Sequence, residues 1–285
     1  MKKFSNYSEF KALVREAYPL SGIDELTRDS EHGYWLDREM FRWYRLCLAC
    51  SDFLGDEGGV LLDVGAFPFT ALKVVKSLCP GVKLSGVGLW DEEVDRILAA
   101  DPLLGDGDFS LCNFDPWIVP PKRLAETGST FSCPDGSVDL VIFTEVIEHL
   151  YNPAHVLKEI SRVLKPGGRL YLTTNNVSYW FYALRVLKGE TNLDRDLSQI
   201  TVDFEREHPH DWRGHVRFYS IGQLVEMLAL AGMKKVLLAT TYDTTDMLPS
   251  QAGVGKQVRT WVKGLTNRMP LMNRLRGHIE IVVEK

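Results

Sequence analysis

Short apolar runs that alternate with helical patterns constrain this chain more than any other feature. Seven such runs predict buried strands, at Val60–Val64, Val82–Val87, Phe109–Cys112, Val138–Phe143, Arg169–Thr174, Lys235–Thr240 and His278–Val283. Helical patterns of about ten residues separate most of these runs, which is typical of strand–helix–strand units and a mainly parallel sheet. We therefore predict an α/β fold in which ligands bind beyond the carboxyl ends of the strands.

The first 55 residues have no strand pattern and predict a helical lid, so we divide the chain into 1–55 and a main domain over 56–285. One helix is expected over Tyr7–Tyr18, and a second from Leu36, where apolar residues recur at the helical period. The polar stretch Ser21–Gly33 between them is expected to be a loop. The five cysteines are odd in number and irregularly spaced, which favours free thiols, and Cys47 and Cys50 are expected to pack in the core.

Composition excludes several classes. The 285 residues are 45% hydrophobic and 25% charged, with a net charge of −5, as in a soluble globular protein. No apolar run approaches the roughly 20 residues of a membrane helix, and the polar N-terminus resembles no signal peptide, so we expect a cytoplasmic protein. The stretch Gly88–Asp115 holds eight acids against Arg96, which makes a nucleic-acid substrate unfavourable.

The most specific motif is CPDGSVDLVIFTEVIEHL at 133–150, followed by LKPGGRL at 164–170. Together with the Asp-x-Gly that ends the first strand, these segments resemble the class I S-adenosylmethionine (SAM)-dependent methyltransferases from about Val60 to Thr174. The resemblance implies a Rossmann-like, doubly wound sheet of seven strands with the last strand antiparallel. It also implies SAM as the cofactor, S-adenosylhomocysteine as the product, and a role in biosynthesis.

The glycine loop departs from the family pattern, because Phe67 and Phe69 stand where glycines are usual. These rings are expected either to stack on the cofactor or to fill space against it. Gly88 replaces the family's ribose-binding acid, so Asp91 either takes that role or caps the next helix. The resemblance places the cofactor at Asp63, Gly65, Ala66, Phe67, Leu89, Trp90, Asp91, Asn113, Phe114, Thr144, Glu145 and Val146. We favour SAM binding through this altered loop over the alternative, a non-catalytic methyltransferase-like scaffold subunit.

Methyl transfer to oxygen or nitrogen requires a base, and histidine is the natural candidate near neutral pH. His149 ends the Glu-x-x-Glu-His run. His215 begins a stretch, His215–Ser220, that resembles a segment of many bacterial methyltransferases of saccharide and small-metabolite pathways. We predict that one of them is the catalytic base, the alternative for His215 being a hydrogen bond at a helix start. His208 and His210 lie in the same stretch.

A metal is a further alternative. The run Glu145, Glu148, His149 resembles the Mg²⁺-binding run of plant small-RNA 2′-O-methyltransferases and of ubiquinone-pathway O-methyltransferases, with His215 as the distal ligand. The same letters occur in family members without a metal, so we leave the metal ligands unassigned and do not favour Mg²⁺.

Two segments bear on the acceptor and on partners. Within the insert 175–219, an aromatic stretch at Tyr179–Gly189 is expected to wall an acceptor pocket, to pack under the N-terminal helices, or to form a homodimer contact. The basic segment 247–279 has six cationic residues and no acid. Its part over 256–276 predicts either a peripheral membrane contact or, as we favour, a solvated helix pair. The predicted function is O-methylation of a saccharide or another small metabolite.

Overall fold

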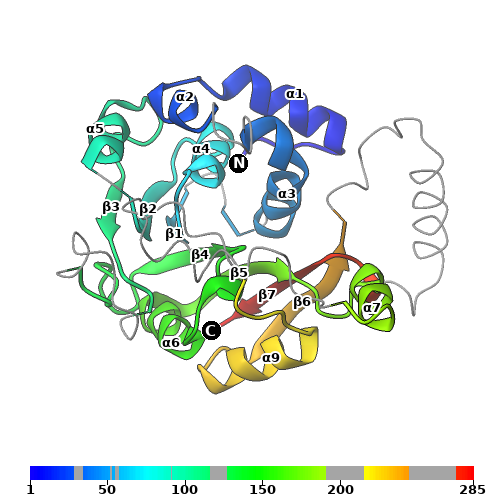
Figure 1. Cartoon of the computed structure of the whole chain (residues 1–285). Coiled ribbons are helices and arrows are strands. Elements are labelled where there is room, and N and C mark those ends of the chain that lie inside the picture. Colours follow the sequence, from blue (N-terminus) through cyan, green and yellow to red (C-terminus); the bar gives the residue numbers. More distant parts are fainter. Residues whose placement is uncertain are drawn as a thin grey trace.

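The computed structural model describes residues 1–28, 35–51, 53–54, 58–90, 92–115, 127–190, 215–243 and 274–285. Its centre is one seven-stranded sheet in the order β3-β2-β1-β4-β5-β7-β6 (Figure 1). The strands are β1 (Val60–Val64), β2 (Lys83–Gly88), β3 (Asp108–Leu111), β4 (Val138–Thr144), β5 (Leu164–Asn175), β6 (Lys235–Tyr242) and β7 (His278–Glu284). Strand β7 runs antiparallel to both of its neighbours, β5 and β6, whereas the other neighbouring strands are parallel. The predicted α/β class, the strand number and the antiparallel last strand are thus confirmed.

Helices cover both faces of the sheet (Figure 1). On one face lie α1 (Tyr7–Ala17), α2 (Gly22–Arg28), α3 (Trp35–Cys50), α4 (Thr70–Leu78) and α5 (Glu92–Ala100), and on the other lie α6 (Pro153–Val163) and α9 (Ile221–Leu230). A short 3₁₀ turn, η2 (Ile147–His149), follows β4. The result is a helix–sheet–helix sandwich with two cores.

The two cores follow from alternation along the strands. In β4, Leu140 and Ile142 pack with α1, α3, α4 and α5, whereas Val141 and Phe143 pack with α6 and α9. All four side chains are fully buried, and each contributes roughly 1.5–3 kcal/mol of hydrophobic free energy. The sheet is therefore fixed from both sides, and the carboxyl ends of its parallel strands meet at one edge.

One prediction for the N-terminal layer is wrong. Residues 22–28 of the expected loop form helix α2, while 29–33 lie outside the described residues. Asp24 in this helix has one partner just before the helix and another on α4. Its carboxylate accepts the Ser21 N–H at 3.0 Å and the buried Lys73 ammonium of α4 at 2.6 Å. A tertiary ion pair thus decides the local structure, and local polarity alone could not show it.

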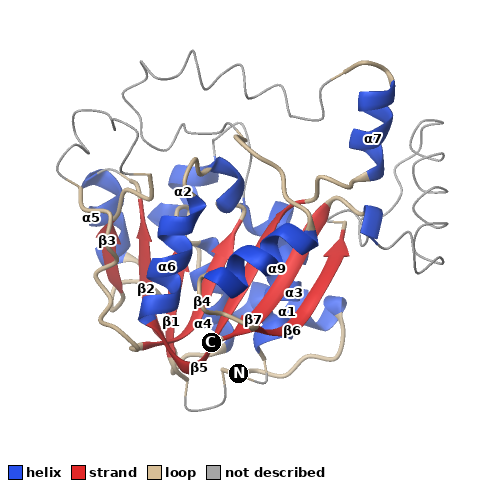
Figure 2. Ribbon diagram, turned by 90° about the horizontal axis from the view of Figure 1, so that it is seen from below, coloured by secondary structure: helices blue, strands red, loops and turns tan. Residues whose placement is uncertain are grey.

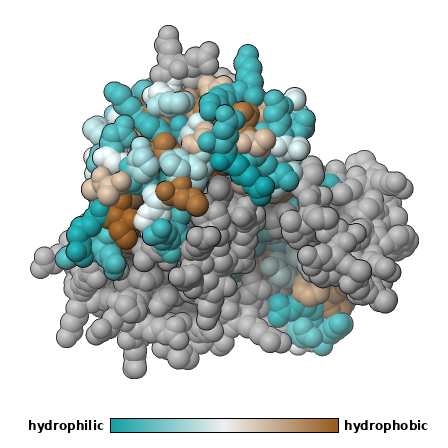
Figure 3. Space-filling model, turned by 90° about the horizontal axis from the view of Figure 1, so that it is seen from above, coloured by the Kyte–Doolittle hydropathy of each residue, from teal (hydrophilic) through white to brown (hydrophobic). Residues whose placement is uncertain are grey.

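The rest of the N-terminal layer agrees with the sequence. Asn6 caps α1 by accepting the Glu9 N–H, and the predicted free cysteines are confirmed, because all five are buried thiols. Figure 3, which views the molecule from the side of α1 and α2, shows mainly hydrophilic residues over the described part of that face. Among the described residues, no helix has the length and apolar character needed to span a membrane.

Helix α7 (Trp180–Leu187) stands away from the sheet (Figure 2). Its start packs through Tyr182, which stacks on Phe218 with ring centroids 5.0 Å apart. The aromatic insert therefore packs against the segment before α9, whereas Leu184 and Leu187 on α7 are exposed. Residues 191–214 of the insert, with His208 and His210, and residues 244–273, with most of the basic segment, lie outside the described residues.

Candidate functional site

The loop after β1 lies against the end of β2. The N–H groups of Gly65 and Ala66 both donate to the carbonyl oxygen of Val87, at 2.8 and 3.2 Å. Gly65 has φ = 86°, a left-handed conformation that favours glycine. A side chain there would begin 2.4 Å from Val146 Cγ2, so the turn after β4 fills the space beside this loop. Three predicted cofactor residues, Gly65, Ala66 and Val146, are thus brought together.

The aromatic residues of the altered loop have separate places. Phe69 is fully buried and meets Trp90 and Phe109 edge to face, at centroid distances of 5.2 and 5.5 Å. Phe69 is therefore part of the core, and the two roles expected of these rings toward the cofactor stay predictions. Phe67 is half-buried beside it, with ring centroids 6.1 Å apart.

The loop after β2 is only partly described. Trp90 is also buried, and its indole N–H donates to Asp95 at 2.6 Å. Leu89 is half-buried, and Asp91 lies outside the described residues. The ribose and adenine roles of Leu89, Trp90 and Asp91 therefore stay predictions.

Asp63, the acid of β1, is buried at 4% exposure. Burial raises the pKa of its carboxyl group to about 7. Within the described residues, this carboxyl group has no ion-pair partner. A buried carboxyl group without a cation is suited to a cationic ligand, because such a ligand would restore the ionised form.

The loop after β3 is anchored to the start of α6. The buried Asp115 carboxylate accepts the N–H groups of Tyr151 and Asn152, at 2.8 and 2.9 Å. Asn113 accepts the Asp115 N–H, and Phe114 packs edge to face on Phe131. Asn113 and Phe114 thus lie at the same sheet edge as Gly65, in a loop that a buried acid holds in place.

The turn after β4 begins with Thr144 and passes through Glu145, whose φ of 54° is in the left-handed region. The Glu145 carboxylate turns toward α3. It accepts Thr173 Oγ1–H at 2.8 Å and Arg42 Nη2–H at 3.1 Å, and it lies 3.4 Å from His278 Nδ1. Burial opposes ionisation, but Arg42 and His278 outweigh it and hold the pKa of Glu145 well below its usual range.

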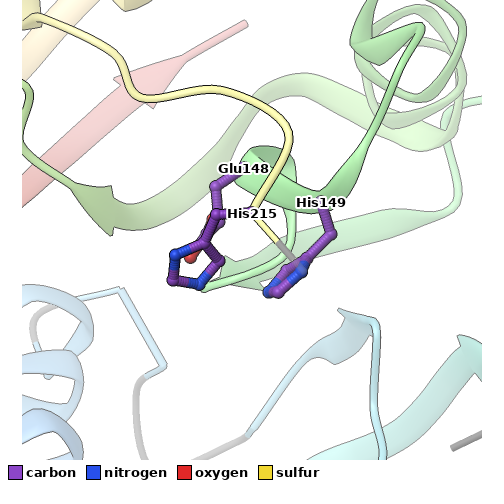
Figure 4. Close-up of side chains that lie close together, drawn as sticks. All are labelled: Glu148, His149 and His215. Carbon is purple, nitrogen blue, oxygen red and sulfur yellow. The ribbon is translucent and has the colours of Figure 1, made fainter. Parts of the chain in front are cut away.

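Three residues after Glu145, the Glu148 side chain meets both predicted catalytic histidines. Figure 4 shows Glu148 and His149 from η2 beside His215 from the chain before α9. The ligand atoms of the three side chains all lie within 4.8 Å of one another, and the two imidazole rings are 4.8 Å apart. We call Glu148, His149 and His215 the edge cluster.

Glu148 is the buried member of the edge cluster. Burial and the nearby Glu145 charge raise the pKa of Glu148 to about 7, although His215 acts in the opposite direction. Its carboxyl group accepts Thr174 Oγ1–H at 2.8 Å, and its backbone oxygen accepts the Val216 N–H at 2.8 Å. One turn therefore holds two carboxyl groups in different states, Glu145 ionised and Glu148 able to exchange a proton near neutral pH.

The structure corrects the predicted group of four metal-ligand candidates. Glu148, His149 and His215 come together, but the carboxylate of Glu145 points to Arg42 and does not join them. Sequence reasoning missed Arg42 and His278. Arg42 lies in a helix whose apolar pattern dominates, whereas His278 faces Asn175 in the β5–β7 register and could have been found from that pairing.

Comparison with known proteins shows the family of this chain. A protein-family model described as a methyltransferase domain matches residues 34–238, well over half of the chain. The chain belongs to the SAM-dependent methyltransferase family. A family relative named ubiquinone biosynthesis O-methyltransferase, from Ruegeria pomeroyi, is 26% identical over 180 residues, which cover 59% of this chain and 62% of the relative. The chain spans about half the length of the curated relatives it matches first.

Two solved structures share the fold. A methyltransferase from Haloferax volcanii, solved with the Trm112 methyltransferase activator, has a TM-score of 0.56 at 18% identity, covering 93% of this chain and 98% of that one. The [4+2]-cyclase SpnF has a TM-score of 0.51 at 20% identity, covering 100% and 98%. At these identities the likeness shows the fold alone, so the reaction of this methyltransferase-family chain must be argued from its site.

Proposed function

We propose that this protein transfers a methyl group from SAM to a hydroxyl oxygen of a small molecule. The observation that carries the proposal is the edge cluster, which places a titratable carboxyl group and two imidazoles beside the turn that packs on the Gly65 loop. A cofactor bound at the ends of β1 and β2 would then lie on one side of this turn, and an acceptor near the edge cluster on the other.

The residues at the cofactor side fit SAM. The Asp63 carboxyl group is buried and has no cationic partner among the residues that the structure describes, and Gly65 leaves room for the Val146 side chain beside its loop. When bound, SAM supplies a methyl group activated as a sulfonium. Asp63 would hold a cationic part of the cofactor, and Thr144, Glu145 and Val146 would line its reactive side. Positioning of this kind can contribute roughly 7–11 kcal/mol to lowering the barrier.

The edge cluster supplies the proton acceptor. As the bond from the acceptor oxygen to the methyl carbon forms and the carbon–sulfur bond breaks, the hydroxyl proton must leave. His149 or His215 accepts it, and the buried Glu148 carboxylate stabilises the resulting imidazolium. Thr174 and Asn175 hold Glu148 by donating to its oxygens, at 2.8 and 3.4 Å.

The names of the curated relatives support oxygen as the atom that accepts the methyl group, since several are ubiquinone biosynthesis O-methyltransferases. A saccharide acceptor stays a prediction. A non-catalytic scaffold remains the rival, because the fold alone does not specify methyl transfer.

The test measures S-adenosylhomocysteine binding by calorimetry and its release during turnover with a panel of catechols and sugars. We expect binding by the wild type, and turnover lowered about 10²- to 10⁴-fold in His149→Gln or His215→Gln with binding retained. The matched control is His155→Gln, because His155 lies on α6 and bonds to the Ser129 oxygen. Absence of binding at millimolar SAM would leave the scaffold as the better description.

A divalent metal at the edge cluster is a second candidate, favoured by the donor set. Ligand atoms about 2.0–2.2 Å from one ion lie within about 4.4 Å of each other, close to the 4.8 Å limit observed. Two imidazoles and one carboxylate suit Zn²⁺ or Mn²⁺ better than Mg²⁺. A bound ion would polarise the acceptor hydroxyl. We expect EDTA to abolish turnover, and Mn²⁺ to restore it in the wild type but not in Glu148→Gln. Turnover that EDTA does not change would exclude a metal at the edge cluster.

A further inference from the structure

Two of the arginines of helix α3, Arg42 and Arg45, lie one turn apart. Arg42 lies between two acids, with Nη2 3.1 Å from Glu145 and Nη1 2.8 Å from Glu39. Arg45 pairs with Glu280, which lies inside β7. Both arginines bind acids, but only Arg42 reaches the turn that separates the cofactor loop from the edge cluster.

The Arg42–Glu145 pair holds a backbone that is unfavourable by itself. A non-glycine residue at φ = 54° costs on the order of 1–3 kcal/mol and persists only where its surroundings fix it. Here the Glu145 N–H donates to the Thr173 oxygen at 2.9 Å, and the carboxylate is bound by Thr173 and Arg42. Arg42 is the only one of these partners that comes from outside the sheet, at a sequence distance of 103 residues.

The residue after Glu145 transmits this orientation to the cofactor loop. Val146 packs where a side chain at Gly65 would begin, 2.4 Å from its Cγ2 atom. If Glu145 turned over, Val146 would move with it, since the two share one turn. Gly65 and Ala66 are in turn bonded to the end of β2. A continuous set of contacts therefore links Arg42, Glu145, Val146 and the Gly65 loop.

We propose that Arg42 is a positioning residue for cofactor binding, through which the docking of α3 on the turn after β4 shapes the SAM pocket. The inference rests on the proposed function, because it takes this edge as the SAM site. By linkage, cofactor binding stabilises the docked position of α3 as much as docking strengthens cofactor binding.

The experiment compares Arg42→Met with Arg45→Met, which removes an equal charge from the same helix. The two arginines are similarly buried, at 18% and 25% side-chain exposure. We expect Arg42→Met to weaken S-adenosylhomocysteine binding about tenfold, equivalent to about 1.4 kcal/mol. Arg45→Met should lower the melting temperature comparably but change the dissociation constant less than about threefold.

A double-mutant cycle with Glu145→Gln tests the pair itself. Arg42→Met and Glu145→Gln should be non-additive in cofactor affinity, and Arg42→Lys should restore part of the binding. KM for SAM should rise more than kcat falls. If Arg42→Met does not fold, Arg42→Lys and Glu145→Gln still measure the effect. Equal affinity changes at Arg42 and Arg45, or no change in a folded Arg42→Met, would overturn the inference. Absence of binding by the wild type would instead overturn the proposed function.

Discussion

Val146 fills the place that a side chain at Gly65 would need, with its Cγ2 atom 2.4 Å from the position of that Cβ. We therefore expect Gly65→Ala to destabilise the protein by roughly 2–4 kcal/mol, combining the left-handed φ of 86° with a steric clash. Cofactor affinity should fall as well, because the loop must move. Urea unfolding and S-adenosylhomocysteine calorimetry measure the two effects.

Gly136→Ala is the control for this change, because Gly136 also has a positive φ, 59°, but an added Cβ would meet nothing within 4 Å. It should lose only the conformational part, about 1–2 kcal/mol. Val146→Ala should recover part of the Gly65→Ala loss. A Gly65→Ala variant no less stable than Gly136→Ala would show that the turn after β4 does not confine the loop.

The protonation of Glu148 should make stability depend on pH. Its pKa rises from 4.5 to about 7 in the folded protein, so this carboxyl group favours folding below pH 4.5 and loses that contribution as pH rises to 7. We compare the free energy of unfolding of Glu148→Gln with that of the wild type at each pH. This difference should favour the variant by roughly 1–3 kcal/mol more at pH 8 than at pH 4.5. Thermal unfolding across this range checks it; a difference independent of pH would contradict the prediction.

The sequence predicts most of the framework because the framework depends on local patterns. Apolar runs such as Val60–Val64 and Val138–Phe143 predict strands that are mostly buried, and the Pro153 start of α6 follows from local backbone chemistry. The motif at 133–150 also predicts the sheet edge at which the site is built.

The direction in which the side chains at that edge point cannot be predicted from local patterns. Glu145 and Glu148 are three residues apart, but a left-handed residue and a 3₁₀ turn send their carboxyl groups to different partners. Helix α2 and the Arg42 contact likewise depend on residues 49 and 103 positions away. Local periodicity carries no information on such pairs.

Ionisation of Asp63 should lower the stability of the free protein and strengthen its binding of SAM. Burial raises its pKa from 3.8 to about 7, so the stability that this carboxyl group contributes at low pH is lost as pH rises through 7 in the free protein. Asp63→Asn should raise the melting temperature more at pH 8 than at pH 5, and weaken binding of SAM at pH 8 by about tenfold through loss of the ionised partner. Calorimetric titration at the two pH values checks this. Unchanged affinity at pH 8 would remove Asp63 from the cofactor site.

Lys73 should be the most costly charge to remove. It is fully buried in α4, and its ammonium donates to Asp24 at 2.6 Å, Asp101 at 2.8 Å and Ser21 at 2.8 Å. Lys73→Met would leave two buried carboxylates without their cation, so we expect a loss of about 3–5 kcal/mol in urea unfolding. Lys73→Met combined with Asp24→Asn and Asp101→Asn should recover much of it, because no uncompensated charge then remains.

The matched control is Lys76→Met on the same helix, whose ion pair with the exposed Asp106 at 3.4 Å should contribute less than about 1 kcal/mol. Equal losses for the two lysine variants would mean that the buried network does not hold α2 on the domain.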